Sequence, residues 1–142
     1  MKQKLLDELM RVSEEEQKYL DGQGDIEKQL YAKEKIGEID RELLLKRGQL
    51  ITVRPHSRFV DFPEHRHNYV EIMYVAQGSI THCIEGKELV LHKGDVLMLN
   101  QQVVHSIKRA DYQDIGSILS HCLNFSRYLY LCLAGRMSLP GL

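Results

Sequence analysis

The sequence has no excess of positive charge. Its 142 residues include 19 basic and 20 acidic side chains, which gives a formal net charge of −1. Proteins that contact phosphate backbones directly usually carry a basic face. The composition therefore argues against direct binding of nucleic acid by these residues.

The sequence also has little cysteine and no long apolar run. Its three cysteines form no C-x-x-C pair and leave one unpaired in any disulfide scheme, which fits a reducing compartment. The first residues, MKQKLLDELMRVSEEEQ, are charged throughout and lack the apolar core of a secretion signal. No stretch approaches the roughly 18 to 20 apolar residues of a membrane span. We therefore expect a cytoplasmic protein with no membrane contact.

Residues 1–48 have helical periodicity. Apolar side chains recur every three or four positions, which predicts helices at Lys4–Leu20 and Asp25–Lys46, separated by the two glycines of DGQGD. Glu14, Glu15 and Glu16 are expected on the solvated face of the first helix. The apolar stripes must be covered, either by the rest of the chain or by a second copy in a homodimer. The sequence leaves both arrangements open.

Residues 49–116 change to a period of two. The segments ITVRPHSRFVDF, YVEIMYVAQG, SITHCIEGKELVLH and GDVLMLN alternate apolar and polar residues and are rich in β-branched side chains. Gly78, Gly86 and Gly94 punctuate them at about eight-residue intervals. Short strands at even spacing with glycine turns predict a mainly β sandwich or barrel rather than alternating strands and helices.

Four residues stand out as a candidate site: His65, His67, Glu71 and His105. Side chains two apart on a strand share a face, so His65 and His67 can converge on one point. Glu71 can join them only if the chain turns around residues 68 and 69, and His105 is expected from a later strand across the barrel. Three imidazoles and a carboxylate suit a divalent metal ion. They equally suit a polar pocket without an ion.

These residues carry a resemblance to the cupin family, which implies a β-barrel of the double-stranded β-helix type. His65-Arg-His67, three residues, Glu71, six residues and Gly78 match the first cupin motif. Gly94 and His105 match the second motif at the family's separation. The chain departs from the family pattern at four positions: Phe59, Asn100, Gln102 and Arg109.

The leader ITVRPHSRFVDFPEHRH and the strands that follow resemble, more narrowly, the N-terminal domain of AraC-type transcription regulators. The resemblance covers about 60 of the 142 residues. In that family the barrel binds a small effector, often a sugar, and a helical segment next to it forms a dimer. The resemblance implies that DNA is bound only through helix-turn-helix units that this chain does not supply.

Two functions remain in view. The first is a small-molecule sensing module, in which His65, His67, Glu71, His105 and Met73 bind the effector and no cofactor is required. The second is a small metal-dependent cupin enzyme, an isomerase or dioxygenase, in which the three histidines and Glu71 hold a divalent metal. The departures from the second motif favour the sensor. Core packing is the simpler role for Met73. Surface or edge positions are expected for His82 and His92, and Arg54 and Arg58 are expected to be solvated charges rather than contacts of an anionic ligand.

Residues 117–142 form an atypical tail that is apolar without a clean period. In relatives the strand after the second motif commonly continues as a segment like INFISLPEFF. Codons for Ser117–Leu131 can be chosen so that the same bases also encode a second peptide. With one base added in front and the reading frame shifted accordingly, they encode INFISLPEFFSISLS. One nucleotide lost near Gly116 would explain the tail. We therefore expect residues 117–142 to pack poorly and to contribute no functional residue.

Overall fold

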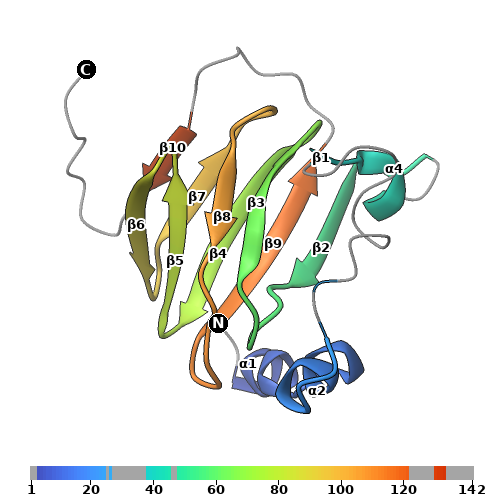
Figure 1. Cartoon of the computed structure of the whole chain (residues 1–142), viewed down its shortest axis with the longest axis vertical. Coiled ribbons are helices and arrows are strands. Elements are labelled where there is room, and N and C mark those ends of the chain that lie inside the picture. Colours follow the sequence, from blue (N-terminus) through green and yellow to red (C-terminus); the bar gives the residue numbers. More distant parts are fainter. Residues whose placement is uncertain (1–2, 25, 27–37, 46–47, 122–129, 134–142) are drawn as a thin grey trace.

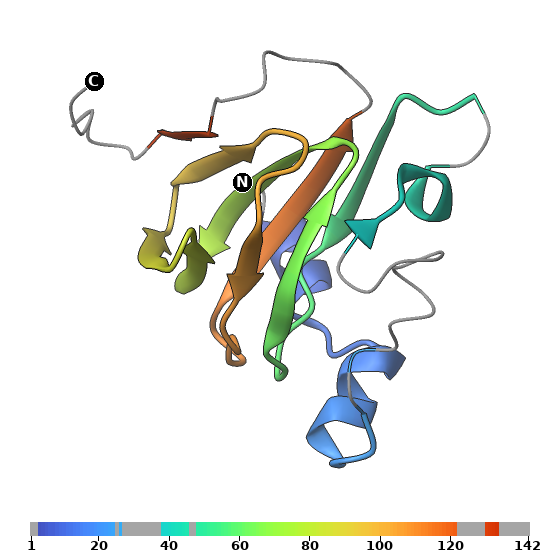
Figure 2. The same ribbon diagram turned by 45° about the horizontal axis from the view of Figure 1, so that its top comes forward.

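The computed structural model describes residues 3–24, 26, 38–45, 48–121 and 130–133 (Figure 1). Most of these residues belong to two five-stranded sheets that lie against each other, with helices at the N-terminal end (Figures 1 and 2). The fold is mainly β and of the cupin type, as the alternating pattern predicted.

The first sheet has the strand order β1-β3-β8-β5-β6. Its pairs are antiparallel except for β1 with β3, which is parallel. The bounds are β1 Glu38–Ile39, β3 Phe62–His67, β8 His105–Ile107, β5 Ser79–Ile84 and β6 Lys87–His92.

The second sheet has the order β10-β7-β4-β9-β2, and all of its pairs are antiparallel. The bounds are β10 Tyr130–Leu133, β7 Val96–Leu99, β4 Val70–Gln77, β9 Ile115–His121 and β2 Ile51–Pro55. The chain passes from one sheet to the other after β1, β2, β3, β4, β6, β7 and β8.

The apolar core lies between the two sheets. It consists of inward-facing residues from six strands: Met73, Val75, Ile80, Ile84, Leu91, Leu97, Leu99, Ile107 and Ile118. The alternation of buried and half-buried positions along β5 and β7 shows why these strands form, since each presents one face to the core. This burial holds the two sheets together and fixes which side chains face the interior.

Two N-terminal helices precede the barrel, as predicted, but their bounds differ. The first predicted helix is two helices, α1 (Gln3–Met10) and α2 (Glu14–Leu20). Ser13 caps α2: its hydroxyl accepts a hydrogen bond from the Glu16 backbone N–H, and the Ser13 N–H donates to the Glu16 carboxylate. This capping box starts a new helix at residue 14. Glu16 is buried rather than solvated, so that expectation was wrong.

The second predicted helix is wrong at its C-terminal end, and residues 25 and 27–37 lie outside the described part. Glu38–Ile39 forms β1 beside β3, and only Arg41–Leu44 is helical, as α4. Ile39 packs with Tyr69 in a small apolar cluster, and Arg66 Nε donates to Glu38 Oε2 at 3.1 Å. These contacts with β3 override the local helical periodicity.

The prediction for the tail is wrong for residues 117–121. They belong to β9, which lies between β4 and β2 in the second sheet. Ile118 and Ser120 are buried at alternate positions, so this segment packs as a regular strand. Residues 130–133 pair with β7, and residues 122–129 and 134–142 lie outside the described part. The barrel therefore extends past the predicted boundary at residue 116.

Candidate ligand and metal site in the barrel

The four candidate residues meet in the barrel interior, and both sheets contribute. His65 and His67 lie on β3, His105 on β8 and Glu71 on β4. The chain turns between β3 and β4, as predicted, which brings Glu71 in from the opposite sheet. His105 does not come from across the barrel: it is paired directly with His65 on the neighbouring strand. That part of the prediction was wrong.

The cluster is tight and buried. One ring nitrogen from each of His65, His67 and His105 lies within 4.8 Å of the others. Glu71 Oε2 lies 3.6 Å from His67 Nε2, and Glu71 Oε1 lies 3.8 Å from His105 Nε2. His67, His105 and Glu71 are almost completely buried, and His65 is 6% exposed.

Backbone carbonyls set the orientation of all three imidazoles. The Nδ1 atoms of His65, His67 and His105 lie 2.8, 3.1 and 3.1 Å from the carbonyl oxygens of Pro63, Tyr69 and Val103. A carbonyl only accepts, so each Nδ1 carries the hydrogen and donates it. In the neutral ring Nε2 is then left with a free lone pair. Nε2 of His67 and of His105 and Oε1 of Glu71 have no hydrogen-bond partner among the described residues.

Burial keeps His65 and His67 uncharged at neutral pH. It lowers the pKa of His65 to about 3, with the neighbouring His105 adding to the effect, and the pKa of His67 to about 4. Burial alone would raise the pKa of Glu71, but the nearby His67, His105 and Arg54 outweigh it and bring that pKa to about 2. At neutral pH the Glu71 carboxylate is therefore ionised beside the uncharged imidazoles of His65 and His67.

Three further polar side chains face the interior. His82 on β5 is fully buried, with its ring 5.9 Å from that of His105, so the surface position expected for it was wrong. His82 lies two residues from Ile80 and two from Ile84, so all three side chains point to the same face of β5. This alternation could have predicted the burial of His82 from the sequence. Arg54 and His56 share the inward phase of β2, where His56 N donates to Gly116 O at 2.9 Å.

A cavity of about 10 Å³ reaches some of these groups, and its lining does not include His67, His82 or His105. Its lining includes Arg54, His56, His65 and Glu71, with apolar walls from Phe62, Ile107 and Ile118. Met73 does not line it and packs in the apolar core instead. Core packing is thus the role that the position of Met73 supports.

The donor set fits a divalent metal. Ligands of one tetrahedral zinc ion lie about 3.4 Å apart, so small rotations of the three imidazoles would bring their Nε2 atoms to that spacing. The buried Nε2 atoms without partners, held by Nδ1 hydrogen bonds to the backbone, have the form that metal-binding histidines take.

The sequence of this part of the chain matches a known family. Residues 56–119 fit the family model described as the AraC-like ligand binding domain. The chain is also similar to the HTH-type transcriptional activator RhaS of Mannheimia succiniciproducens, with 30% identity over 89 residues, 63% of this chain and 33% of the relative. The chain thus spans about a third of the length of this curated relative.

Solved structures with a similar arrangement share little sequence with this AraC-like domain. KdgF from Halomonas sp. has 19% identity over 53% of this chain and 72% of its own, with a TM-score of 0.46. A cupin-2 domain-containing protein from Shewanella frigidimarina has 15% identity over 50% and 68%, with a TM-score of 0.42. The polyketide cyclase RemF from Streptomyces resistomycificus has 18% identity over 51% and 54%, with a TM-score of 0.43.

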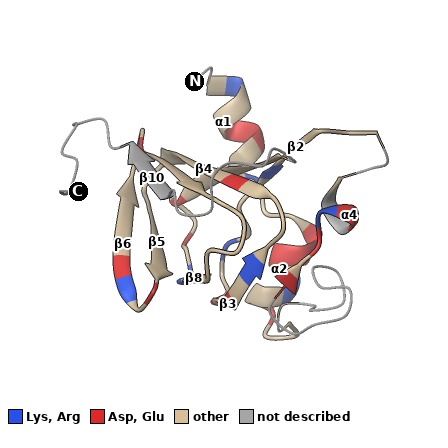
Figure 3. Ribbon diagram, turned by 90° about the horizontal axis from the view of Figure 1, so that it is seen from above, with Lys and Arg blue, Asp and Glu red and all other residues tan. Residues whose placement is uncertain are grey.

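Charged residues of the AraC-like domain and its helices gather mainly on the helices and turns, and most of the strands carry few (Figure 3). Glu71 and Arg54 are therefore unusual in facing the interior. None of the described helices is long and apolar enough to cross a lipid bilayer.

Proposed function

We propose that this chain is the small-molecule sensing part of a cytoplasmic AraC-type regulator, with a polar effector bound at the histidine cluster. The observation that carries the proposal is the buried set of His67, Glu71 and His105 inside the AraC-like segment, with acceptor atoms that have no hydrogen-bond partner among the described residues. A polar group buried without a partner costs about 1–3 kcal/mol. A ligand that supplies the missing hydrogen bonds recovers this cost.

The effector in this proposal is a hydroxyl-rich molecule, with a sugar as the first choice. The unpartnered Nε2 atoms of His67 and His105 and Oε1 of Glu71 are acceptors, so the cluster matches the O–H donors of hydroxyl groups. Arg54 in the cavity lining can donate to the oxygen of such a group. A regulatory effect requires that the ligand bind two arrangements of the chain with different affinity. In this proposal, α1 and α2 are the elements of the described chain whose position relative to the barrel differs between the two arrangements.

Thermal unfolding with a panel of sugars, sugar acids and polyols tests the sensing role. A ligand at 100 times its Kd should stabilise the domain by about 2.7 kcal/mol. His67→Ala should abolish the shift, whereas His92→Ala, on the exposed face of β6, should retain it. A shift that survives His67→Ala would place the ligand elsewhere.

The metal-dependent enzyme is the second candidate, because three imidazole nitrogens converge within 4.8 Å. His65, His67 and His105 would hold a divalent ion, with Glu71 beside it, and the ion would supply a Lewis acid. Metal analysis after purification and a zinc titration monitored calorimetrically test this. Binding that is lost in His105→Ala but kept in His92→Ala supports a metal site, and an absence of tight binding removes the enzyme from consideration.

We further propose that the chain forms a homodimer through α1. Leu5 and Met10 are 48% and 39% exposed on this helix, and α1 has no buried residue. An apolar stripe of this kind favours association. Sedimentation equilibrium should give a dimer that Leu5→Glu converts to a monomer, and a monomeric parent chain would refute the idea.

DNA contact is proposed to lie outside these residues, in agreement with their balanced charge. The nucleotide sequence after the codon for His121 tests this: helix-turn-helix units encoded there in any frame support the proposal, and their absence in every frame refutes it.

A further inference from the structure

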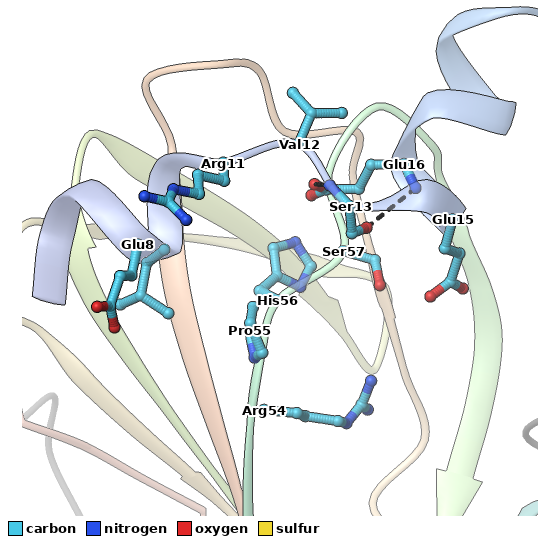
Figure 4. A pocket seen from close by; sticks show the side chains of 11 residues that line it. Glu8, Arg11, Val12, Ser13, Glu15, Glu16, Arg54, Pro55, His56 and Ser57 are labelled. Atoms are coloured by element: carbon cyan, nitrogen blue, oxygen red, sulfur yellow. Dashed lines mark hydrogen bonds between the residues drawn. The ribbon is translucent and has the colours of Figure 1, made fainter.

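A second and larger pocket lies outside the barrel, between the N-terminal helices and the end of β2. Its volume is about 490 Å³. The end of α1 and the link to α2 form one wall, and β2 with the residues after it forms the other (Figure 4). Leu9, Val12 and Pro55 supply apolar surface. This junction pocket is large enough for a small organic molecule.

The two pockets meet at a shared wall. Arg54, His56 and Ser57 line both the junction pocket and the cavity that reaches His65 and Glu71. His56 is only 5% exposed, and its Nε2 is buried with no hydrogen-bond partner among the described residues. In Figure 4 its ring lies between Arg11 on one side and Arg54 on the other.

The acidic groups around the pocket are mostly engaged. Glu16 accepts hydrogen bonds from the backbone N–H and Nε of Arg58 through Oε1, and from Arg58 Nη2 and Ser13 N through Oε2. Glu15 accepts from the Tyr19 hydroxyl at 2.7 Å. Glu8 lies at the exposed rim. At the inner end of the pocket an anionic ligand would therefore meet Arg54 and the His56 nitrogen, where the Glu16 carboxylate is already paired with Arg58.

We propose that the junction pocket binds a small carboxylic acid with an apolar body. The carboxylate lies against Arg54 and His56 at the inner end, because a guanidinium and an imidazole N–H both donate to carboxylate oxygens. The apolar body lies against Leu9, Val12 and Pro55. Such a ligand touches the link between the helices and β2 at once and ties the helices to the barrel. This site is separate from the histidine cluster and does not depend on the function proposed for it.

Benzoate and its uncharged isostere benzamide test the proposal on the full chain. Both are titrated to about 10 mM, which would saturate a site with a Kd of 1 mM or tighter, while backbone amide shifts are followed by NMR. Benzoate should shift the amides of Met10–Ser13 and those of Arg54, His56 and Ser57 together and saturably. Benzamide should bind about tenfold or more weakly, because it lacks the charge.

Variants separate a charge effect from a folding effect. Arg54→Gln and His56→Ala should each weaken benzoate binding about tenfold, and Arg54→Lys should restore part of it. Arg109→Gln replaces an exposed arginine that does not line the pocket, and it should leave benzoate binding unchanged. The proposal is overturned if benzoate does not saturate the parent chain. It is equally overturned if benzamide binds as well, or if the shifts centre on His65–Glu71 rather than on the junction.

Discussion

Glu16 on α2 and Arg58 after β2 form a buried ion pair between residues that lie 42 positions apart in the chain. Arg58 Nε donates to Glu16 Oε1 at 2.8 Å, and the two side chains are 2% and 7% exposed for Arg58 and Glu16. The guanidinium also donates to the carbonyls of Met10 and Arg11, so it contacts the end of α1 as well. This pair joins the helices to the barrel.

Glu16→Gln should therefore destabilise the domain strongly. The substitution leaves the Arg58 charge buried without its counter-charge, which typically costs about 3–5 kcal/mol. Urea unfolding of the purified chain measures the change. Glu88→Gln is the matched control, because the Lys108–Glu88 pair is exposed and should matter little. Equal effects of the two substitutions would mean that the buried pair does not hold the helices in place.

Without bound metal, the domain should begin to lose stability as the pH falls below about 6.5, well before the pH reaches 4.5. Burial lowers the pKa values of His56, His65, His67 and His82 to about 3–4. The unfolded chain therefore takes up protons below pH 6.5 that the folded chain does not. Each histidine then removes up to about 1.4 kcal/mol of stability per pH unit.

Urea midpoints between pH 7.5 and 5 measure this loss. The Glu16 carboxylate acts in a different window: Arg58 and the Ser13 N–H lower its pKa from 4.5 against the effect of burial, so its contribution is lost only at lower pH. A midpoint that stays constant from pH 7.5 to 5 would contradict the burial of the histidines.

Gly78→Ala should be far more disruptive than Gly86→Ala. Both glycines have positive φ, 70° and 77°, so both substitutions carry similar backbone strain. A Cβ at Gly78 would lie 2.6 Å from the backbone oxygen of Gln113, whereas nothing lies within 4 Å of one at Gly86. We expect about 1–3 kcal/mol more destabilisation at Gly78 from overpacking. Equal unfolding midpoints of the two variants would contradict the close approach of the two loops.

His82→Leu should stabilise the domain without ligand. Both ring nitrogens of His82 are buried and have no hydrogen-bond partner among the described residues. Replacing an unsatisfied buried polar group by an apolar one of similar volume should gain about 1–3 kcal/mol. The exposed His92→Leu serves as control and should change little. A loss of stability in His82→Leu would indicate that His82 is hydrogen-bonded in solution.

Much of the histidine cluster could be predicted from the sequence, because several of its residues lie close together in the chain. His65 and His67 share a face by strand periodicity, and the turn before Glu71 follows from their separation. The helical preface was harder. The S-x-x-E pattern at Ser13–Glu16 signals the start of α2. Helical periodicity alone does not reveal this break, and it predicted a single continuous helix.

The sequence by itself determined the mainly β fold, the positions of most strands and the four residues that meet inside the barrel. The alternation of apolar and polar residues indicates which side chains share a face of a strand, and it can be recognised from residues that are neighbours along the chain. Only the tertiary structure decided that Arg58 is buried against Glu16, that Glu38–Ile39 pairs with β3, and that residues 117–121 lie between β4 and β2. The reason is physical: burial and strand pairing depend on residues 28 to 70 positions away, and no local period carries that information.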